Sequence, residues 1–312
     1  MMLTLFRRSL SKFVCLSAAL ALGACGPELS GPEGAGLEST TAPLLTGATA
    51  RLRLMAANIS SGNYQSYDPG EGGRIFQGTK PDVVMIQEFN YKTGSTADIR
   101  EFVSTYFDSS FSSYRESGAQ IPNGIISRYP IVESGEWTDS EVSNRDFAWA
   151  RIDIPGPVDL WAVSVHLLTR SSGARQSEAS QLVNYIKGKV PTGDYLAIGG
   201  DFNTGSRDEA AINTLRSVVV TTNPPPVDCN GKSGTNASRA KPYDWVLADG
   251  DLDAYKTATV IGTRTFPTGL VADTRTHSPL ADISPARAGD SGATNMQHMG
   301  IVRDFLIPTG AP

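Results

Sequence analysis

Nine residues, YLAIGGDFN at positions 195–203, join an apolar run to a polar string and bear most directly on the fold. The apolar part, Tyr195 to Gly199, is short and continuous, which is typical of a buried strand. Asp201 and Asn203 follow where such a strand ends, and loops at strand ends often carry binding and catalytic groups. Because Asp and Asn are also favoured in ordinary turns, this string alone allows a turn as well as a site.

The same kind of apolar run, followed by polar residues, recurs along the chain and predicts further strands. These runs span residues 51–59, 82–87, 124–127, 147–154, 160–166 and 243–247. Apolar residues at helical spacing predict helices at 95–106, 174–187 and 208–216, with Gly188 ending the second. Many strands with a minority of helices indicate an α/β protein in which helices cover packed sheets.

Seven polar residues beside these runs are candidates for chemistry: Asn58, Glu88, His166, Asp201, Asn203, Asp244 and His298. A carboxylate among amides and histidines suits a hard cation and a phosphate, because Mg²⁺ needs few oxygen ligands and keeps waters. Phosphodiester hydrolysis also needs an activated water and compensation of the phosphoryl charge. The plainer alternatives are loop capping by Asn58 and an ion pair of Glu88 with an arginine. His277 is the one histidine of the chain that is not in this set. It lies in a polar loop and is expected at the surface.

Taken in order, these strings resemble the endonuclease/exonuclease/phosphatase superfamily, which includes deoxyribonuclease I, apurinic endonucleases, bacterial sphingomyelinases and inositol-polyphosphate 5-phosphatases. The strings are ANI (57–59), IQE (86–88), NGIISRYP (123–130), SVH (164–166), GGDFN (199–203) and the late pair Asp244 and His298. GGDFN is the most specific, and the common order gives the others their weight. The likeness runs from Leu52 to Phe305 and implies an α/β fold, a four-layer α/β/β/α sandwich of two packed mixed sheets flanked by helices.

The resemblance also implies roles for the polar groups. Glu88, with Asn58 beside it, would hold the divalent metal, Mg²⁺ or Mn²⁺. Asp201 would position or deprotonate the attacking water, and Asn203 would bind a phosphoryl oxygen. His166 would act near the leaving group, as an acid or a phosphate ligand.

Three further residues complete the implied site. His298, oriented by Asp244, would be the second catalytic histidine, and Arg145 would contact the substrate phosphate.

Two departures from the family pattern bear on the number of metals. Ser60 stands where the family usually has an acid, and Gln297 replaces the acid before the final histidine. A neutral Gln297 can bond to a phosphate oxygen or a water but is a weak ligand for a hard cation. We therefore expect one metal per site. The strand containing Asn123 and Gly124 also offers no acid to partner His166.

The first residues predict export and a lipid anchor. Arg7, Arg8 and Lys12 precede an apolar run too short to span a bilayer, and the run ends at Leu22-Gly23-Ala24-Cys25. The ending resembles a bacterial lipobox, with residues 1–24 as signal peptide and Cys25 as lipidation site; a plain signal peptide is the alternative. Gly26 after the cysteine indicates the outer membrane, outside the cytoplasm. Residues 25–49 are rich in Gly, Pro, Ser and Thr and predict a tether, which leaves residues 50–312 as one domain.

Charge and cysteine content narrow the classes of partner. Removing residues 1–24 removes three cations and no acid, so the net charge changes from −5 to −8. An acidic domain argues against broad electrostatic capture of nucleic acid, although a bound metal would supply local positive charge. After processing, Cys229 is the one cysteine besides Cys25, and we expect it to be structural.

The resulting prediction is an extracytoplasmic phosphodiesterase, with nucleic acid as the favoured substrate and a membrane anchor at the N-terminus. No Trp-rich hairpin favours a sphingomyelinase, because Trp137, Trp149, Trp161 and Trp245 are scattered, and no basic cluster favours a phosphatase of inositol or sugar phosphates. A non-catalytic binding module is the alternative from another class. The sequence identifies no protein partner.

Overall fold

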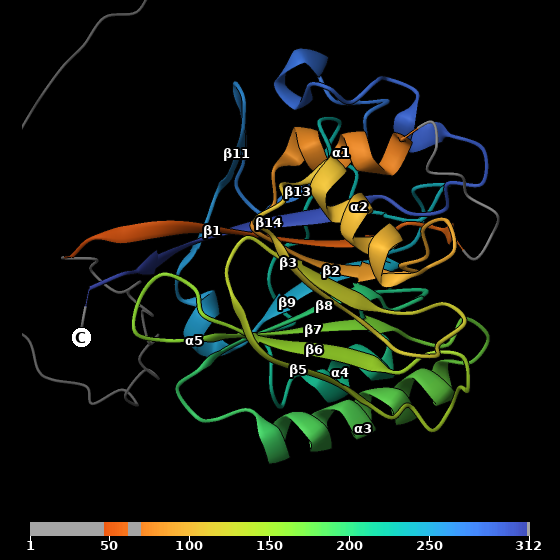
Figure 1. Cartoon of the computed structure of the whole chain (residues 1–312), viewed down its shortest axis with the longest axis vertical. Coiled ribbons are helices and arrows are strands. Elements are labelled where there is room, and N and C mark those ends of the chain that lie inside the picture. The colour runs from red at the N-terminus through yellow and green to blue at the C-terminus, as the bar shows by residue number, and fades with distance from the viewer. Residues whose placement is uncertain (1–46, 62–69, 311–312) are drawn as a thin grey trace, which may run out of the picture. The chain divides into compact units, whose positions relative to one another are not determined.

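The computed structural model describes residues 47–61 and 70–310, so the predicted signal peptide, Cys25 and most of the tether lie outside the described residues. Two β-sheets pack face to face with helices on both outer sides, which confirms the predicted α/β sandwich (Figure 1). Within the described residues, no helix has both the length and the apolar character needed to cross a membrane.

The larger sheet is mixed and contains the first and last strands of the domain. Its order is β10-β14-β1-β2-β4-β3, with β13 also paired to β14. The strands are β1 (Thr49–Asn58), β2 (Val83–Gln87), β3 (Ser112–Arg115), β4 (Gly124–Ser127), β10 (Lys256–Thr257), β13 (Leu270–Ala272) and β14 (Gly300–Pro308). β1 is parallel to β2 and antiparallel to β14.

The smaller sheet has the order β5-β6-β7-β8-β9. Its strands are β5 (Ile131–Trp137), β6 (Phe147–Ile152), β7 (Leu160–His166), β8 (Tyr195–Asp201) and β9 (Asp244–Ala248). β7 and β8 are parallel, whereas the other neighbours in this sheet are antiparallel. A separate hairpin pairs β11 (Thr259–Ile261) with β12 (Arg264–Phe266).

Helices cover the outer faces of both sheets. α1 (Glu71–Thr79) and α2 (Thr96–Tyr106) lie over the larger sheet, and α3 (Ser172–Lys189) and α4 (Ala210–Leu215) lie over the smaller one (Figure 1). The short helices are α5 (Gly250–Asp253), η2 (Leu280–Ile283) and η3 (Asp290–Gly292). α3 continues through Gly188 to Lys189, two residues beyond the predicted end at residue 187.

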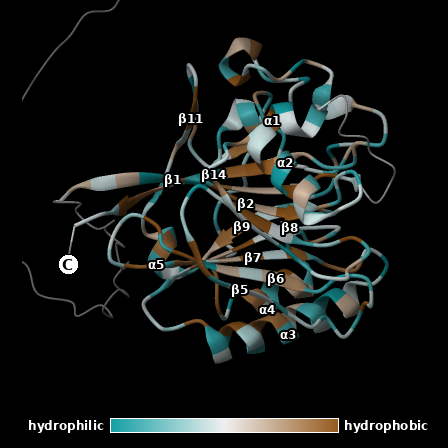
Figure 2. Cartoon of the chain, in the orientation of Figure 1, coloured by the Kyte–Doolittle hydropathy of each residue, from teal (hydrophilic) through white to brown (hydrophobic). Residues whose placement is uncertain are grey.

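The alternation of side chains along each strand builds the layers. In β1, Leu52 and Leu54 face the core between the sheets, whereas Met55 faces the core under α1 and α2. Apolar residues accordingly line the strands of both sheets in Figure 2. A polar bridge crosses this core, because Gln87 Nε2 donates to Ser164 Oγ at 2.8 Å and so joins β2 to β7.

The expectation that His277 lies at the surface is wrong. Its side chain is buried, with its ring against Phe266 and its Nδ1 3.8 Å from Cys229 Sγ. Phe266 and Cys229 belong to segments distant in the sequence, and they cover a loop that is locally polar. Cys229 is half-buried against the same cluster.

Candidate active site

The strand directions bring the predicted site residues to one edge of the sandwich. β1 and β2 end at Asn58 and just before Glu88, while β7 and β8 end at His166 and Asp201. β9 runs against β8 and begins there with Asp244, and His298 directly precedes the antiparallel β14. Residues from both sheets therefore converge from six separate parts of the chain.

Asp201 Oδ2 is the centre of this arrangement. It accepts hydrogen bonds from Asn58 Nδ2 at 3.1 Å and from Asn203 Nδ2 at 3.1 Å. The Nε2 atoms of His166 and His298 lie 3.3 Å and 3.5 Å from the same oxygen. One carboxylate oxygen thus links four groups that come from both sheets.

Glu88 and Asn58 lie together, as predicted for a metal site. Asn58 Nδ2 donates to Glu88 Oε1 at 3.1 Å, while Asn58 Oδ1 accepts from the Ser60 amide at 2.8 Å. Glu88 has a φ of 54°, and Asn203 has a φ of 50°. Non-glycine residues in this left-handed region are uncommon and gather at functional sites.

Burial and charge act in opposite directions on the acids and bases of the site. Burial raises the pKa of Asp201 to about 7, although the nearby His298 opposes the shift. Burial alone would lower the pKa of His298, but Asp244 and Asp201 outweigh it and raise that pKa to about 9. His298 is thus a cation at neutral pH, with its Nδ1 3.1 Å from Asp244 Oδ2.

His166 is the neutral histidine of the site. Burial lowers its pKa well below the usual value, and the positive charges of Arg145 and His298 add to this effect. Its Nε2 faces Asp201 Oδ2, and its buried Nδ1 has no hydrogen-bond partner among the described residues. The absence of an acid partner from the Asn123 strand agrees with the sequence.

Asn203 lies beside Asp201, but both hydrogens of its side-chain amide already form hydrogen bonds within the protein. Asn203 Nδ2 donates to Leu167 O at 3.0 Å as well as to Asp201 Oδ2. Its backbone amide donates to Asp201 Oδ1 at 2.9 Å. A hydrogen bond to a phosphoryl oxygen would have to replace one of the two side-chain bonds.

Arg145 lies in the wall of the site and bonds mainly to the protein itself. Its Nε donates to the carbonyl oxygen of His166, and its Nη2 donates to that of Leu167 at 3.2 Å. Its Nη1 donates to Asn144 Oδ1 at 2.9 Å. The predicted contact of Arg145 with a phosphate would use the remaining N–H groups.

The two neutral departures, Ser60 and Gln297, lie in contact. The backbone amide of Gln297 donates to Ser60 Oγ at 3.2 Å, so the two loops meet through neutral groups at this point. Ser60 is buried and Gln297 is half-buried.

Two groups of side chains offer ligands for a cation, and one fits better. Glu88 Oε1 and Asp201 Oδ2 both lie 3.1 Å from Asn58 Nδ2, so two carboxylate oxygens converge beside the Asn58 amide. Coordination by Asn58 Oδ1 would require that oxygen to give up its hydrogen bond from the Ser60 amide. Asp201, Asp244 and His298 also offer atoms within 4.8 Å of one another. In that group the two ring nitrogens of His298 face the two carboxylates, so a cation there would have to replace these contacts.

A cavity of about 420 Å³ opens over these groups. Besides the predicted residues, it is lined by Gln120, Ile121, Asn144, Thr169 and Tyr243. Sequence reasoning missed these five because they lie in loops without a motif. Among the described lining residues, Arg145 is the one arginine or lysine.

Solved structures share this fold. An endonuclease/exonuclease/phosphatase from Bacteroides vulgatus matches with a TM-score of 0.57 and 13% identity over 83% of this chain and 99% of that chain. An endonuclease/exonuclease/phosphatase from Beutenbergia cavernae matches with a TM-score of 0.56 and 15% identity, over 84% of this chain and 72% of that chain. TDP2 of D. rerio, humanized by 14 mutations, matches with a TM-score of 0.53 and 17% identity, over 82% of this chain and 98% of that chain. At these identities the likeness concerns the fold alone.

Sequence comparison identifies the family. A search of curated proteins finds no match. The model of the Endonuclease/Exonuclease/phosphatase family matches residues 50–267, a range that includes every predicted site residue except Gln297, His298 and Cys25. Members of this family are typically phosphoester hydrolases and usually depend on a divalent metal. The matched range covers well over half of the sequence, and the chain therefore belongs to the endonuclease/exonuclease/phosphatase family.

Proposed function

We propose that this protein is a Mg²⁺- or Mn²⁺-dependent phosphodiesterase that cleaves nucleic acid outside the cytoplasm. The observation that carries the proposal is the convergence of Asn58, His166, Asn203 and His298 on Asp201 Oδ2, with Glu88 beside them. Such a set combines a base, hydrogen-bond donors and hard ligands at one point.

Glu88 and Asn58 would hold a single cation. The cation would polarise a phosphoryl oxygen and offset the charge of the acids. Ser60 and Gln297 are neutral where the family pattern usually has acids, so we propose one metal per site.

The remaining residues would carry the proton transfer and the charge. Asp201, with a pKa near neutrality, would orient the attacking water and accept its proton. The cationic His298, held by Asp244, would donate to a phosphoryl oxygen as negative charge develops there. Neutral His166 would donate a hydrogen bond on the leaving-group side, and Asn203 would bind a phosphoryl oxygen.

The charge of the cavity favours a phosphodiester over a polyphosphate. The arginine in the wall, Arg145, is bonded to backbone carbonyls, and Glu88 and Asp201 are acids that line the cavity. With one divalent cation, the site would suit a singly charged phosphodiester better than a ring that carries several dianionic phosphates.

The test of catalysis uses bis-p-nitrophenyl phosphate. We expect turnover that EDTA abolishes and Mg²⁺ or Mn²⁺ restores, with Glu88→Gln sharply weakening the response to metal. The control is Glu133→Gln, which removes an exposed carboxylate paired with Lys189. Metal-independent turnover, or wild-type metal affinity in Glu88→Gln, would contradict the proposed metal site. No turnover on any substrate would favour a binding module.

The substrate is tested with plasmid DNA, RNA, sphingomyelin and inositol phosphates under the same conditions. Cleavage of DNA or RNA supports the nuclease proposal. Turnover confined to sphingomyelin or to inositol phosphates would overturn it while leaving the phosphoesterase intact.

The proposed location rests on the sequence of residues 1–25. Processing before Cys25 and acylation of its thiol would place the domain outside the cytoplasm on a lipid anchor, at the outer membrane.

A further inference from the structure

The segment from His166 to Thr169 is fixed by an unusually dense set of hydrogen bonds. The Leu167 amide donates to the carbonyl oxygen of Asp201 at 2.9 Å, and the Leu168 amide donates to the carboxyl group of Glu178. Its carbonyls accept from Asn203, Arg145 and Arg175. We call residues 166–169 the His166 turn. Because His166 begins it, whatever holds the turn also sets the position of the imidazole.

Glu178 holds this turn from helix α3 without touching the reaction centre. Both carboxylate oxygens lie 2.9 Å from Leu168 N, and the side chain is fully buried. Arg175, one turn earlier, donates from Nη1 to Leu168 O at 2.9 Å and to Thr169 O at 3.1 Å. The apolar pattern of residues 174–187 gives no sign that Arg175 and Glu178 are buried.

A second buried acid, Asp139, lies in the loop after β5 and interacts electrostatically with Glu178. Burial raises the pKa of Glu178 to about 8, and the nearby Asp139 adds to this shift. Asp139 Oδ1 accepts from the Glu141 amide at 3.0 Å, whereas Asp139 Oδ2 has no hydrogen-bond partner among the described residues.

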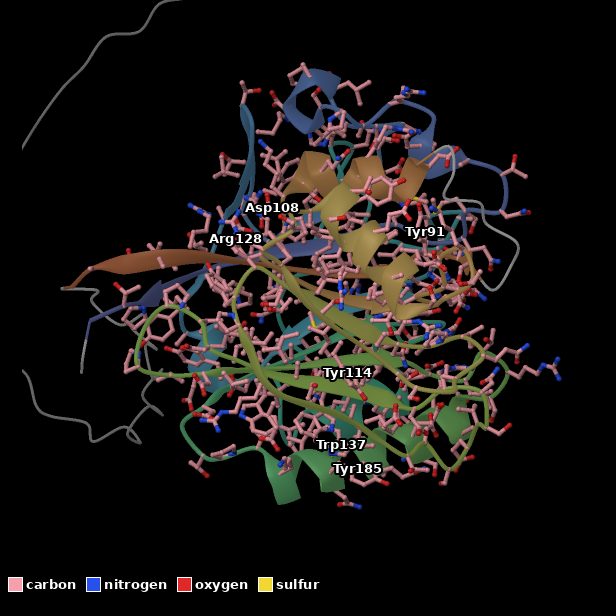
Figure 3. The ribbon with its side chains drawn as sticks, in the orientation of Figure 1. Tyr91, Asp108, Tyr114, Arg128, Trp137 and Tyr185 are labelled. Carbon is pink, nitrogen blue, oxygen red and sulfur yellow. The ribbon has the colours of Figure 1, made fainter. Side chains whose placement is uncertain are left out.

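The loop that carries Asp139 lies against α3 along four consecutive residues. Trp137 stacks on Tyr185 at 5.6 Å, and the two labelled rings lie together in Figure 3. Tyr185 Oη donates to Thr138 O at 3.1 Å. Ser140 donates to Gln181 Oε1 from its amide at 3.0 Å. These contacts hold the end of β5 and the loop after it against α3.

We propose that Glu178 is a positioning residue for His166. Its carboxyl group holds the Leu168 amide and thereby fixes the turn from which His166 faces Asp201. This assignment rests on the proposed phosphodiesterase function, because His166 is given its role there.

The decisive comparison is between three variants on α3. Glu178→Ala removes the bond to Leu168 and should lower kcat on bis-p-nitrophenyl phosphate on the order of tenfold or more, with KM little changed, since small displacements of catalytic groups are costly. Glu178→Gln can still accept from Leu168 N through its amide oxygen, so it should retain kcat within a few-fold of wild type. Gln181→Ala is the matched control, because it loses a bond to the same loop one turn away from the His166 turn.

A double-mutant cycle shows whether the effect passes through His166. Added to His166→Ala, Glu178→Ala should cost less than about twofold, because the residue it positions is gone. The full tenfold loss in that background, or an unchanged kcat in Glu178→Ala alone, would overturn the proposal.

Amide exchange gives a readout that does not need activity. The Leu168 amide should exchange faster in Glu178→Ala than in wild type or Gln181→Ala, as measured by NMR in the metal-free protein. Equal exchange in all three would reject the positioning role. Faster exchange in Glu178→Ala, combined with a wild-type protein that cleaves no phosphoester, would instead contradict the proposed function and leave the structural link intact.

Discussion

Asp244 and His298 are joined so closely that neither is expected to function alone. Asp244 Oδ2 bonds to His298 Nδ1 at 3.1 Å, which leaves Nε2 directed at Asp201. We predict that Asp244→Asn lowers kcat nearly as much as His298→Ala, and that the double variant is little worse than either. Steady-state measurements of kcat for the three variants test this prediction. Losses that multiply would show that the two residues act independently.

The raised pKa of His298 predicts a pH dependence of stability in metal-free protein. The folded state keeps the proton up to about pH 9, while the unfolded histidine loses it near 6.5. The pair therefore stabilises the fold fully below pH 6.5, and this contribution is lost as pH rises to 9, by about 1.4 kcal/mol per unit.

Denaturant unfolding in EDTA at several pH values measures this effect. The difference in free energy of unfolding between wild type and His298→Gln should shrink across pH 6.5–9. A difference that stays constant would mean that His298 is not protonated in the folded protein.

At the scale of elements, Gly200 fixes the approach of β8 to β7. Its φ is 147°, and a Cβ there would lie 2.0 Å from the carbonyl oxygen of Val165. We predict that Gly200→Ala lowers the free energy of unfolding by about 2–4 kcal/mol. Gly188→Ala is the control, because its Cβ would meet nothing within 4 Å in α3, and it should raise stability by about 0.5–1 kcal/mol. Similar melting temperatures for the two variants would contradict the role of Gly200.

Elements that the sequence predicts are those whose own periodicity agrees with their packing. β4 and β7 have the predicted bounds, and the apolar face of α3 is buried as expected. α1 was missed because its glycines disfavour a helix, yet Gly73 is required there, since a Cβ would lie 2.1 Å from the Tyr106 ring. Tertiary packing, which no local pattern shows, decides that helix.

The residues of the site also fall into those that the sequence predicts and those that it does not. The groups at strand ends were predictable because a motif marks the end of each strand, as with Glu88 and Asp201. Glu178 was not, because a charged residue on a helix usually faces water. Only the approach of the Leu168 amide from another element explains its burial. His277 was misjudged for the same reason.

At the scale of the whole molecule, the proposed lipid anchor depends on one thiol. We predict that wild-type protein enters the detergent phase in a Triton X-114 partition and that Cys25→Ser does not, because the acyl group has no attachment point. Cys229→Ser is the control, since that cysteine belongs to the folded domain. Unchanged partitioning of Cys25→Ser would reject the lipoprotein proposal.

The antiparallel pairing of β1 with β14 has a practical consequence for handling the molecule. Thr49 pairs with Pro308, so the chain enters and leaves the domain at one end. Asn58 lies nine residues further along β1, about 30 Å away. A bead, a sensor chip or a fusion partner joined at either end would therefore leave the mouth of the cavity open to large polymers in solution.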